Sequence, residues 1–528
     1  MSTHEPRRPI WRILLALAPA LAAAPAGGAA ELRIGMAVSP TTLDPHFHAD
    51  AANFALQRHL FEALLQWSHD GRLLPMLARQ WTPLAGGAGW ELRMDPAARF
   101  ADGTPVRAED AAASLHRAMT IPDSPGRYTP FLVGLRRVEV AAPDVLRLYT
   151  DGPAPLLPNG LTTILVVPAR IAATAAPAAF NAGAAVLGSG PFRLRAYRRG
   201  EGALLERDEG WWQVARRPAP EWKRVSLRVL PQDSARLGAL LAGELDLIEN
   251  LPPRDAQGVA GTLGLRLVRQ PGTRVMYVAL NHRPELRPGE ANPLADPRVR
   301  RALSLALDRT ALATQVMDGE AAPTAQIMPP GRDSADPALR PVPADRAGAR
   351  RLLEEAGWSR GLRLELSGTT DRFTNDEQLL QALAQMWRQA GIEVSVEASP
   401  AVSFFPRYGA GRFSMALFGW LTGPGEPNSF LTALLASRDP ARGRGALNGT
   451  GYGNPRLDAL IDTALATPGA GPRNALWRQA ARLALDEDVA LLPLFHQAST
   501  WAMRAGITYD ARVDSLTLAL DAHQAAAP

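Results

Sequence analysis

Two neighbouring histidines are the first residues whose spacing could support chemistry. His46 and His48 are separated by one residue, and a pair of imidazoles can bind a metal ion. A protein metal site needs further ligands, but none is close in the sequence and the chain contains no cysteine. We therefore expect no metal site and interpret both as solvated loop histidines. His496, which follows the apolar run 491–495, is expected to be a hydrogen-bonded neighbour of the core.

Catalytic signatures are the next feature to consider. The sequence has no His-Glu-x-x-His, no Gly-x-Ser-x-Gly and no Gly-x-x-x-x-Gly-Lys, which excludes the common hydrolase and nucleotide-binding motifs. Scattered Asp and Glu residues leave acid-base catalysis open as an alternative. We therefore expect no enzymatic activity and no cofactor. A hydrolase and a peptide chaperone are the two alternative functions.

The first thirty residues differ from the rest of the chain. Basic residues precede a short apolar run that ends in small residues: Arg7, Arg8, Arg12, Ile13–Ala26 and Ala29–Ala30. This order is typical of a signal peptide, and the run is shorter than the ~20 residues that a membrane span requires. We expect cleavage near Ala30 and a mature periplasmic protein, without a lipid anchor because there is no cysteine to carry one.

Composition and charge limit the number of domains and the kinds of partner. The chain has 528 residues, 46% of them hydrophobic, which predicts two or three domains. Its net charge of +5 would fall to +3 without residues 1–30. No basic run alternates with aromatic residues, so nucleic acid is not an expected partner. We expect a monomer.

Hydrophobic periodicity predicts the elements of an α/β fold. Residues 31–38 alternate as a strand, and residues 53–65 have helical spacing. Strands at 90–94 and 145–149 surround a helix at about 108–119, which predicts a small inserted domain. Residues 362–398 form a βαβ unit, in which 374–377 is interpreted as a capping box. Three aspartates are interpreted as further helix caps: Asp233, Asp296 and Asp345.

Several short motifs occur in one order along almost the whole mature chain. They are residues 39–46, 60–65, 70–78, 100–105, 188–192, 241–246, 296–303, 352–357, 418–420 and 426–430. In this order they resemble the extracytoplasmic solute-binding proteins of peptide/nickel-type ABC importers. The resemblance implies a two-lobed periplasmic binding protein type II-like α/β fold with an additional inserted domain. It also implies a small-molecule solute held between the lobes and delivered to the membrane permease of an ABC importer.

We divide the chain on this basis. The N-terminal lobe is residues 31–270, with the inserted domain at about 75–187. The second lobe is residues 271–489, and residues 490–528 return to the first lobe. The lobes are therefore expected to be joined by short crossings that act as a hinge.

The resemblance also implies where the solute binds. The segment 404–430 corresponds to a loop that lines the cleft, and Trp420 is the residue expected to form an aromatic wall. The other expected ligand-binding residues are Val38, Ser39, Tyr128, Phe404, Tyr408, Thr422 and Gly423. Arg127 is interpreted as a surface charge.

Gly423 marks a departure from the family pattern. It stands where the family has an aspartate that pairs with the free amino group of a peptide. Leu417 stands where some members carry an arginine. An enclosed ammonium without a partner costs several kcal/mol, so Glu426 is considered as a substitute acid. Peptide, modified peptide, glycoside, opine-like compound and metal chelate all remain open as the solute.

Overall fold

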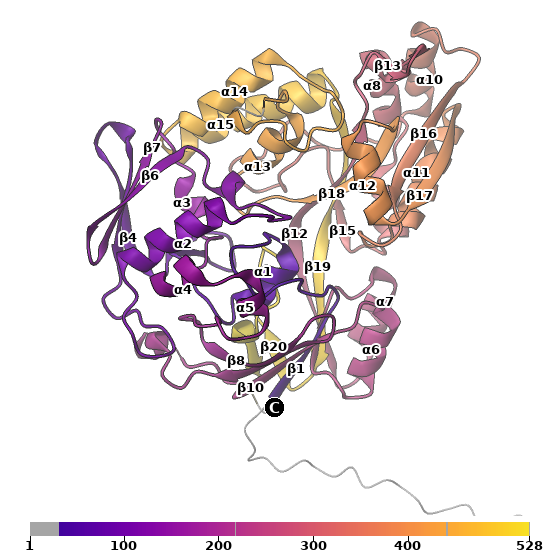
Figure 1. Cartoon of the computed structure of the whole chain (residues 1–528). Coiled ribbons are helices and arrows are strands. Elements are labelled where there is room, and N and C mark those ends of the chain that lie inside the picture. Colours follow the sequence, from indigo (N-terminus) through magenta and orange to yellow (C-terminus); the bar gives the residue numbers. More distant parts are fainter. Residues whose placement is uncertain (1–30, 217, 440–441, 527–528) are drawn as a thin grey trace, which may run out of the picture.

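One long mixed sheet organises the protein. The computed structural model describes residues 31–216, 218–439 and 442–526, so the expected signal peptide lies outside the described residues. The strand order is β17-β16-β18-β12-β19-β11-β1-β10-β9-β8, and β15 (Ala321–Pro323) pairs with β19. Helices cover this sheet at both ends (Figure 1). No helix within the described ranges is long and apolar enough to cross a membrane.

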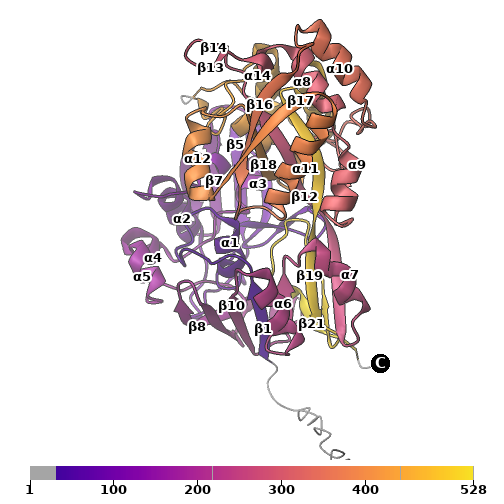
Figure 2. The same ribbon diagram turned by 90° about the vertical axis from the view of Figure 1, so that its right-hand side faces the viewer.

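Two strands run the full length of the molecule. β12 (Leu265–Leu280) and β19 (Leu491–Arg504) pair antiparallel, with irregularities between Gln270 and Arg274 and between Met276 and Tyr277. Figure 2 shows them passing from the first lobe to the second. The division that we propose near residues 270 and 490 therefore falls inside β12 and at the start of β19.

The first lobe is built on the N-terminal strand. β1 (Glu31–Met36) lies between β10 (Arg224–Val229) and β11 (Leu247–Glu249), parallel to both, so the predicted strand is confirmed. Leu32, Ile34 and Met36 point into one core, as their alternation predicts. The sheet is completed by β8 (Phe192–Arg198) and β9 (Gly202–Arg207). The covering helices are α1 (Ala51–Gln57), α4 (Ala169–Thr174), α5 (Pro177–Asn181), α6 (Asp233–Leu241) and α7 (Pro253–Gly261).

A separate four-stranded sheet projects from this lobe (Figure 1). Its order is β4-β5-β7-β6, and its members are β4 (Ala78–Pro83), β5 (Gly89–Met94), β6 (Leu135–Ala142) and β7 (Val145–Thr150). α2 (Ala108–Thr120) packs against it, and α3 (Leu157–Gly160) follows. This arrangement contains the strands and helix that the sequence predicts there.

The second lobe contains the predicted βαβ unit. β16 (Leu362–Thr369) and β17 (Ile392–Ser399) pair in parallel on either side of α11 (Asp376–Gln389), which confirms that prediction. β18 (Met415–Leu421) lies between β16 and β12. One face of this sheet packs on α8 (Pro297–Leu305), α10 (Arg346–Glu355) and α11, and the other on α12 (Ala401–Gly409), α13 (Asn428–Phe430), α14 (Pro455–Ala466) and α15 (Ala470–Arg482). α9 (Arg309–Ala311) precedes β15.

Three short hairpins complete the fold. They are β2 (Leu65–Trp67) with β3 (Leu73–Pro75), β13 (Glu285–Arg287) with β14 (Glu290–Ala291), and β20 (Ile507–Tyr509) with β21 (Ala522–Gln524). The last of these belongs to the C-terminal segment, which packs into the core of the first lobe.

The helix predicted at 53–65 is shorter than expected. α1 ends at Gln57, and Leu60 is buried in irregular backbone beyond it. The carbonyl oxygens of His59 and Leu60 accept hydrogen bonds from Phe192 and Gly190, so they are used by a distant segment. The local periodicity reflects burial of these apolar side chains, and tertiary pairing decides their conformation.

The predicted helix caps have mixed outcomes. Asp296 and Asp345 cap α8 and α10 as predicted. The capping box at 374–377 is wrong, because Asn375 adopts a left-handed conformation (φ 55°) and the carboxylate of Asp376 accepts hydrogen bonds from the preceding loop. The cap at Asp233 is also wrong by one residue. It lies inside α6, where it pairs with Arg236.

We predict that Gly272→Ala disturbs the crossing between the lobes. Gly272 is buried in β12, and a Cβ there would overlap the carbonyl oxygen of Gln497 in β19. The substitution should lower the free energy of unfolding by about 1–3 kcal/mol, because rigid backbone must move. Gly238→Ala, at an exposed position in α6 with open space, should instead stabilise by about 0.5–1 kcal/mol. Equal denaturation midpoints for the two variants would contradict this.

Candidate functional site

Trp420 lies near the end of β18, opposite Val275 of β12. Its ring is half-buried and meets Phe430 edge-on, with ring centroids 6.3 Å apart. Leu156 of the first lobe packs against the same apolar cluster, so Trp420 is close to the boundary between the lobes. Its indole Nε1 is buried and has no acceptor among the described residues. A buried indole N–H usually has a partner, so this donor is available to a ligand.

Phe404 and Tyr408 lie behind this strand. They are buried in an aromatic cluster in which the Tyr408 ring is 4.3 Å from that of Phe418. Burial raises the pKa of Tyr408 to about 12, so its hydroxyl stays neutral. In this conformation the two side chains support β18 from within the core, and their contact with a solute stays a prediction.

Thr422 fixes the exit of β18. Its hydroxyl donates to the carbonyl of Thr273 at 2.9 Å, and the Thr273 hydroxyl donates to the Thr422 carbonyl at 2.8 Å. Gly423 follows, exposed, and a Cβ placed on it would meet nothing within 4 Å. The reciprocal pair therefore holds Gly423 beside open space. That space has room for an acidic side chain, which this chain does not supply.

Glu426 does not supply the missing acid. Its carboxylate is buried and accepts hydrogen bonds from Nε and Nη2 of Arg473 and, at 2.6 Å, from Nε1 of Trp477. Both oxygens are therefore used inside the second lobe. The hypothesis that Glu426 replaces an aspartate at 423 is corrected: the sequence placed it near the loop, and tertiary packing turned it toward α15.

We predict that Glu426→Gln acts on stability. Loss of the charge leaves the Arg473 guanidinium buried without its partner, which should lower the free energy of unfolding by about 3–5 kcal/mol. Glu354→Gln, exposed on α10, should change it by less than about 0.5 kcal/mol. Chemical denaturation checks both, and full stability of Glu426→Gln would argue against this assignment.

The first-lobe residues occupy different environments. Val38 is 46% exposed just beyond β1, and the Ser39 hydroxyl donates to the Pro40 carbonyl. Tyr128 is fully buried against His46, and its hydroxyl has no hydrogen-bond partner in the part of the chain described. Arg127 is exposed, as expected of a surface charge. Of the three predicted ligand-binding residues of this lobe, Val38 and Ser39 are reached by solvent and Tyr128 is not, and all three ligand contacts stay predictions.

The histidine pair is structural. His46 is fully buried, which corrects the expectation of a solvated loop histidine. Its Nε2 lies 2.7 Å from the Leu165 carbonyl, and its Nδ1 faces Arg117, which forms an ion pair with Asp44. Burial lowers the pKa of His46 to about 4, so it is neutral at physiological pH. His48 is half-buried and hydrogen-bonded to Thr41.

His496 is also part of the structure. His496 is buried with Nε2 2.9 Å from the Ile327 carbonyl, which confirms its predicted place beside the core. Within the described ranges, no group of three His, Cys, Asp or Glu residues is arranged to hold a metal ion.

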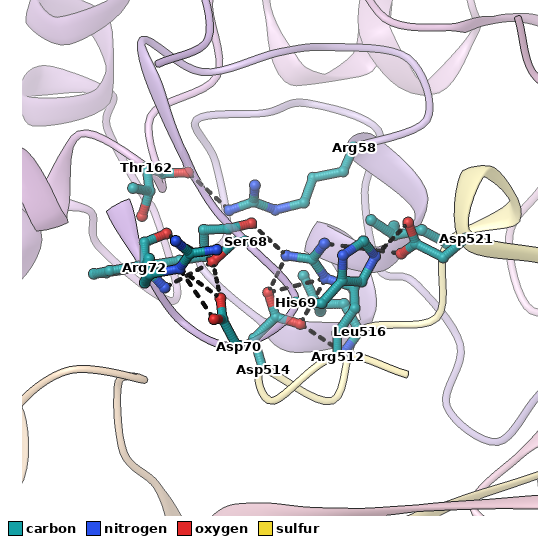
Figure 3. Close-up of polar contacts among 12 residues, drawn as sticks. Arg58, Ser68, His69, Asp70, Arg72, Thr162, Arg512, Asp514, Leu516 and Asp521 are labelled. Atoms are coloured by element: carbon teal, nitrogen blue, oxygen red, sulfur yellow. Dashed lines mark hydrogen bonds and ion pairs between the residues drawn. The ribbon is translucent and has the colours of Figure 1, made fainter. Parts of the chain in front are cut away.

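Sequence reasoning missed one contact between the lobes, the turn Ser68–Arg72 joining β2 to β3. Figure 3 shows this turn beside the C-terminal segment, where His69 Nε2 lies 3.0 Å from Asp521. On the other side, the Asp70 carbonyl accepts a hydrogen bond from Arg332 of the second lobe at 3.1 Å. Gly71 also packs directly against Pro424. The Asp-Gly pair indicated a turn, but only the structure shows what the turn touches.

We predict that the contribution of the His69–Asp521 hydrogen bond to stability depends on pH. The hydrogen bond to Asp521 raises the pKa of His69 above its ordinary value of about 6.5. The stabilisation is therefore complete below about pH 6.5 and is lost as the pH rises through the folded-state pKa. His69→Asn should reduce the free energy of unfolding by less than about 1 kcal/mol at pH 6, because the pair is half-exposed, and by still less at pH 9. Urea titrations that give the same difference at both pH values would contradict this.

Comparisons with known proteins agree over most of the chain. Residues 72–441 match the model of the bacterial extracellular solute-binding proteins, family 5 (middle region). The glutathione-binding protein GsiB of Salmonella paratyphi A is 26% identical over 480 residues, covering 89% of this chain and 90% of the relative. GsiB of Pectobacterium atrosepticum is 24% identical, covering 89% of both chains.

Solved structures show the same fold. The PBP AgaA of A. tumefaciens R10, in complex with agropinic acid, superposes with a TM-score of 0.77 at 21% identity, covering 94% of this chain and 99% of that one. The Escherichia coli murein tripeptide binding protein MppA gives a TM-score of 0.77 at 22% identity, covering 94% and 98%.

Proposed function

The chain belongs to the bacterial extracellular solute-binding proteins of family 5, and we propose that it captures a peptide-like solute between its two lobes. It has the two-lobed α/β fold of the type II periplasmic binding proteins, with the additional four-stranded sheet. It is the substrate-binding component of an ABC importer and is not an enzyme. Its partner is accordingly the membrane permease of that importer.

The observation that carries the proposed site is the indole N–H of Trp420, which has no acceptor among the described residues and lies three residues before the open position Gly423. An aromatic ring offers contact area to an apolar or planar group, and its N–H selects an acceptor. Thr422 and Thr273 lock the backbone next to it, so the donor is held in place before a solute arrives. Such preorganisation lowers the entropic cost of binding.

A glutathione-like solute is consistent with the glycine at 423. A free ammonium at the end of a peptide would have no carboxylate from this position or from Glu426. In glutathione the ammonium lies beside a carboxylate on the same glutamyl carbon, so it brings its own counter-charge. The curated relatives named for glutathione binding support testing this tripeptide first.

Closure follows from contacts that only the approach of the lobes creates. The turn Ser68–Arg72 meets Arg332 and Pro424, and Pro424 is adjacent to Gly423. A solute that touches Trp420 and the first lobe favours the state in which these contacts form. We propose export through the N-terminal residues 1–30 and action in the periplasm as a monomer.

The test is titration calorimetry of the mature protein with glutathione, together with mass spectrometry of solutes that co-purify. Trp420→Ala should weaken binding at least tenfold, about 1.4 kcal/mol, because stacking area and the N–H donor are both lost. Trp358→Ala, half-buried at the edge of the other core of the same lobe, should leave affinity within twofold. Unchanged affinity in folded Trp420→Ala would remove Trp420 from the site.

Two further measurements separate the proposal from its alternatives. Solution scattering should show a more compact particle when solute is present, and the solute should be recovered chemically intact. Turnover would indicate a hydrolase. Weak binding to unfolded chains, without one saturable site, would indicate a chaperone.

A further inference from the structure

Arg274 lies where β12 crosses from one lobe to the other. It is opposite Leu421 of β18 and Gln497 of β19, immediately after an irregularity in the β12-β19 pairing. Alternation along the strand places its side chain on the same face as Met276, which packs beside Phe373. Arg274 therefore faces the loop that joins β16 to α11.

Arg274 has no partner for its charge in the part of the chain that the structure describes. No hydrogen bond or ion pair joins its guanidinium to any residue in the described ranges, although protein surrounds it on most sides and leaves it half-buried. Other enclosed arginines do make such contacts, although the Nε atoms of Arg58 and Arg444 are buried without a hydrogen-bond partner among the described residues. Arg117 pairs with Asp44, Arg473 with Glu426, and Arg309 donates to the Pro493 carbonyl. An enclosed cation without a partner is unfavourable unless an anion or water joins it.

The charged group that acts on Arg274 is a second arginine, Arg372. Burial, together with the positive charge of Arg372, lowers the pKa of Arg274 to about 10. Arg372 is exposed on the loop after β16, and its side chain also lacks a partner among the residues described. The two guanidinium groups therefore repel each other, and neither side chain bonds to a carboxylate among the described residues, although the Arg372 backbone N–H donates to Asp376.

This pair is at the functional end of the second lobe. β16 and β18 run parallel, so their carboxyl ends meet at one edge of the sheet. Arg372 follows the first of these ends, and Gly423 follows the second. Ligands of open parallel sheets bind outside the carboxyl ends of the strands. A solute beside Gly423 can therefore reach the arginines on one face of β18 and Trp420 on the other.

We propose that Arg274, assisted by Arg372, binds a carboxylate of the solute and makes this protein selective for acidic ligands. This proposal rests on the proposed function, because it assigns the ligand class of the same site. Guanidinium groups bind carboxylates through two parallel hydrogen bonds, which gives both strength and orientation. The missing acid at 423 and the unpaired arginines together reverse the expected polarity of the site, from cation to anion recognition.

The test compares glutathione with glutathione diethyl ester, in which both carboxylates are blocked. The wild-type protein should bind the acid at least tenfold more tightly than the ester in calorimetry. Arg274→Ala should weaken the acid 10- to 100-fold and remove the preference, while Arg274→Lys should lie between. Arg266→Ala, an exposed arginine on the same strand, should match wild type. Thermal melts establish that each variant is folded.

The outcomes separate the two proposals. Equal binding of acid and ester by wild type, or full affinity in folded Arg274→Ala, would overturn the role of Arg274 and leave solute capture intact. If neither probe binds, mass spectrometry identifies the solute that co-purifies with each variant, and its chemistry tests the role of Arg274. An acidic solute lost from Arg274→Ala but retained by Arg266→Ala supports the assignment, and a solute without an acidic group overturns it. A protein that holds no solute at all removes the proposed function itself.

Discussion

The antiparallel pairing of β12 with β19 is the constraint on which the rest of the molecule depends. Both lobes are built outward from these two strands, so each lobe keeps its own core while the backbone ladder continues between them. A continuous ladder resists sliding but permits bending and twisting where its pairing is irregular, at Gln270–Arg274. The same short segment contains Gly272, Thr273 and Arg274, so the irregular pairing, the hydrogen bonds to Thr422 and the enclosed cation are adjacent in the chain.

Buried charge is handled in two different ways in this protein. Glu426 with Arg473, and Asp44 with Arg117, are enclosed ion pairs whose hydrogen bonds are satisfied inside one lobe. Such pairs fix the geometry of the surrounding core and leave nothing for a ligand. Arg274 and the indole N–H of Trp420 are enclosed donors without acceptors in the described ranges. Satisfied groups support structure, whereas these unsatisfied donors are the groups that we propose bind the solute.

The family pattern and the individual site give different information. Membership of the family establishes that the protein is the solute-binding component of an importer. Gly423 and the neighbouring arginines then indicate how this member departs from receptors that recognise a peptide ammonium. On our proposal, the missing carboxylate and the arginines change the preferred ligand through electrostatics, with no change of fold.

The sequence by itself determined the local elements and the family. Alternation in residues 31–36 and 362–366 follows from which side chains face a core, and the βαβ unit follows from that alternation and the intervening helix. The ordered motifs identified the family, and with it the region around Trp420. These signals are local, because each depends only on neighbours along the chain.

Only the tertiary structure decided how distant segments use the same residues. Gly190 and Phe192 take the carbonyls that would have extended α1, and Arg473 takes the carboxylate that the sequence left available in Glu426. No motif or periodicity in the sequence singles out Arg274, because it is a single arginine in a strand. Its importance is the absence of a partner among the described residues. That property depends on every element packed around it, so no local reading of the chain contains it.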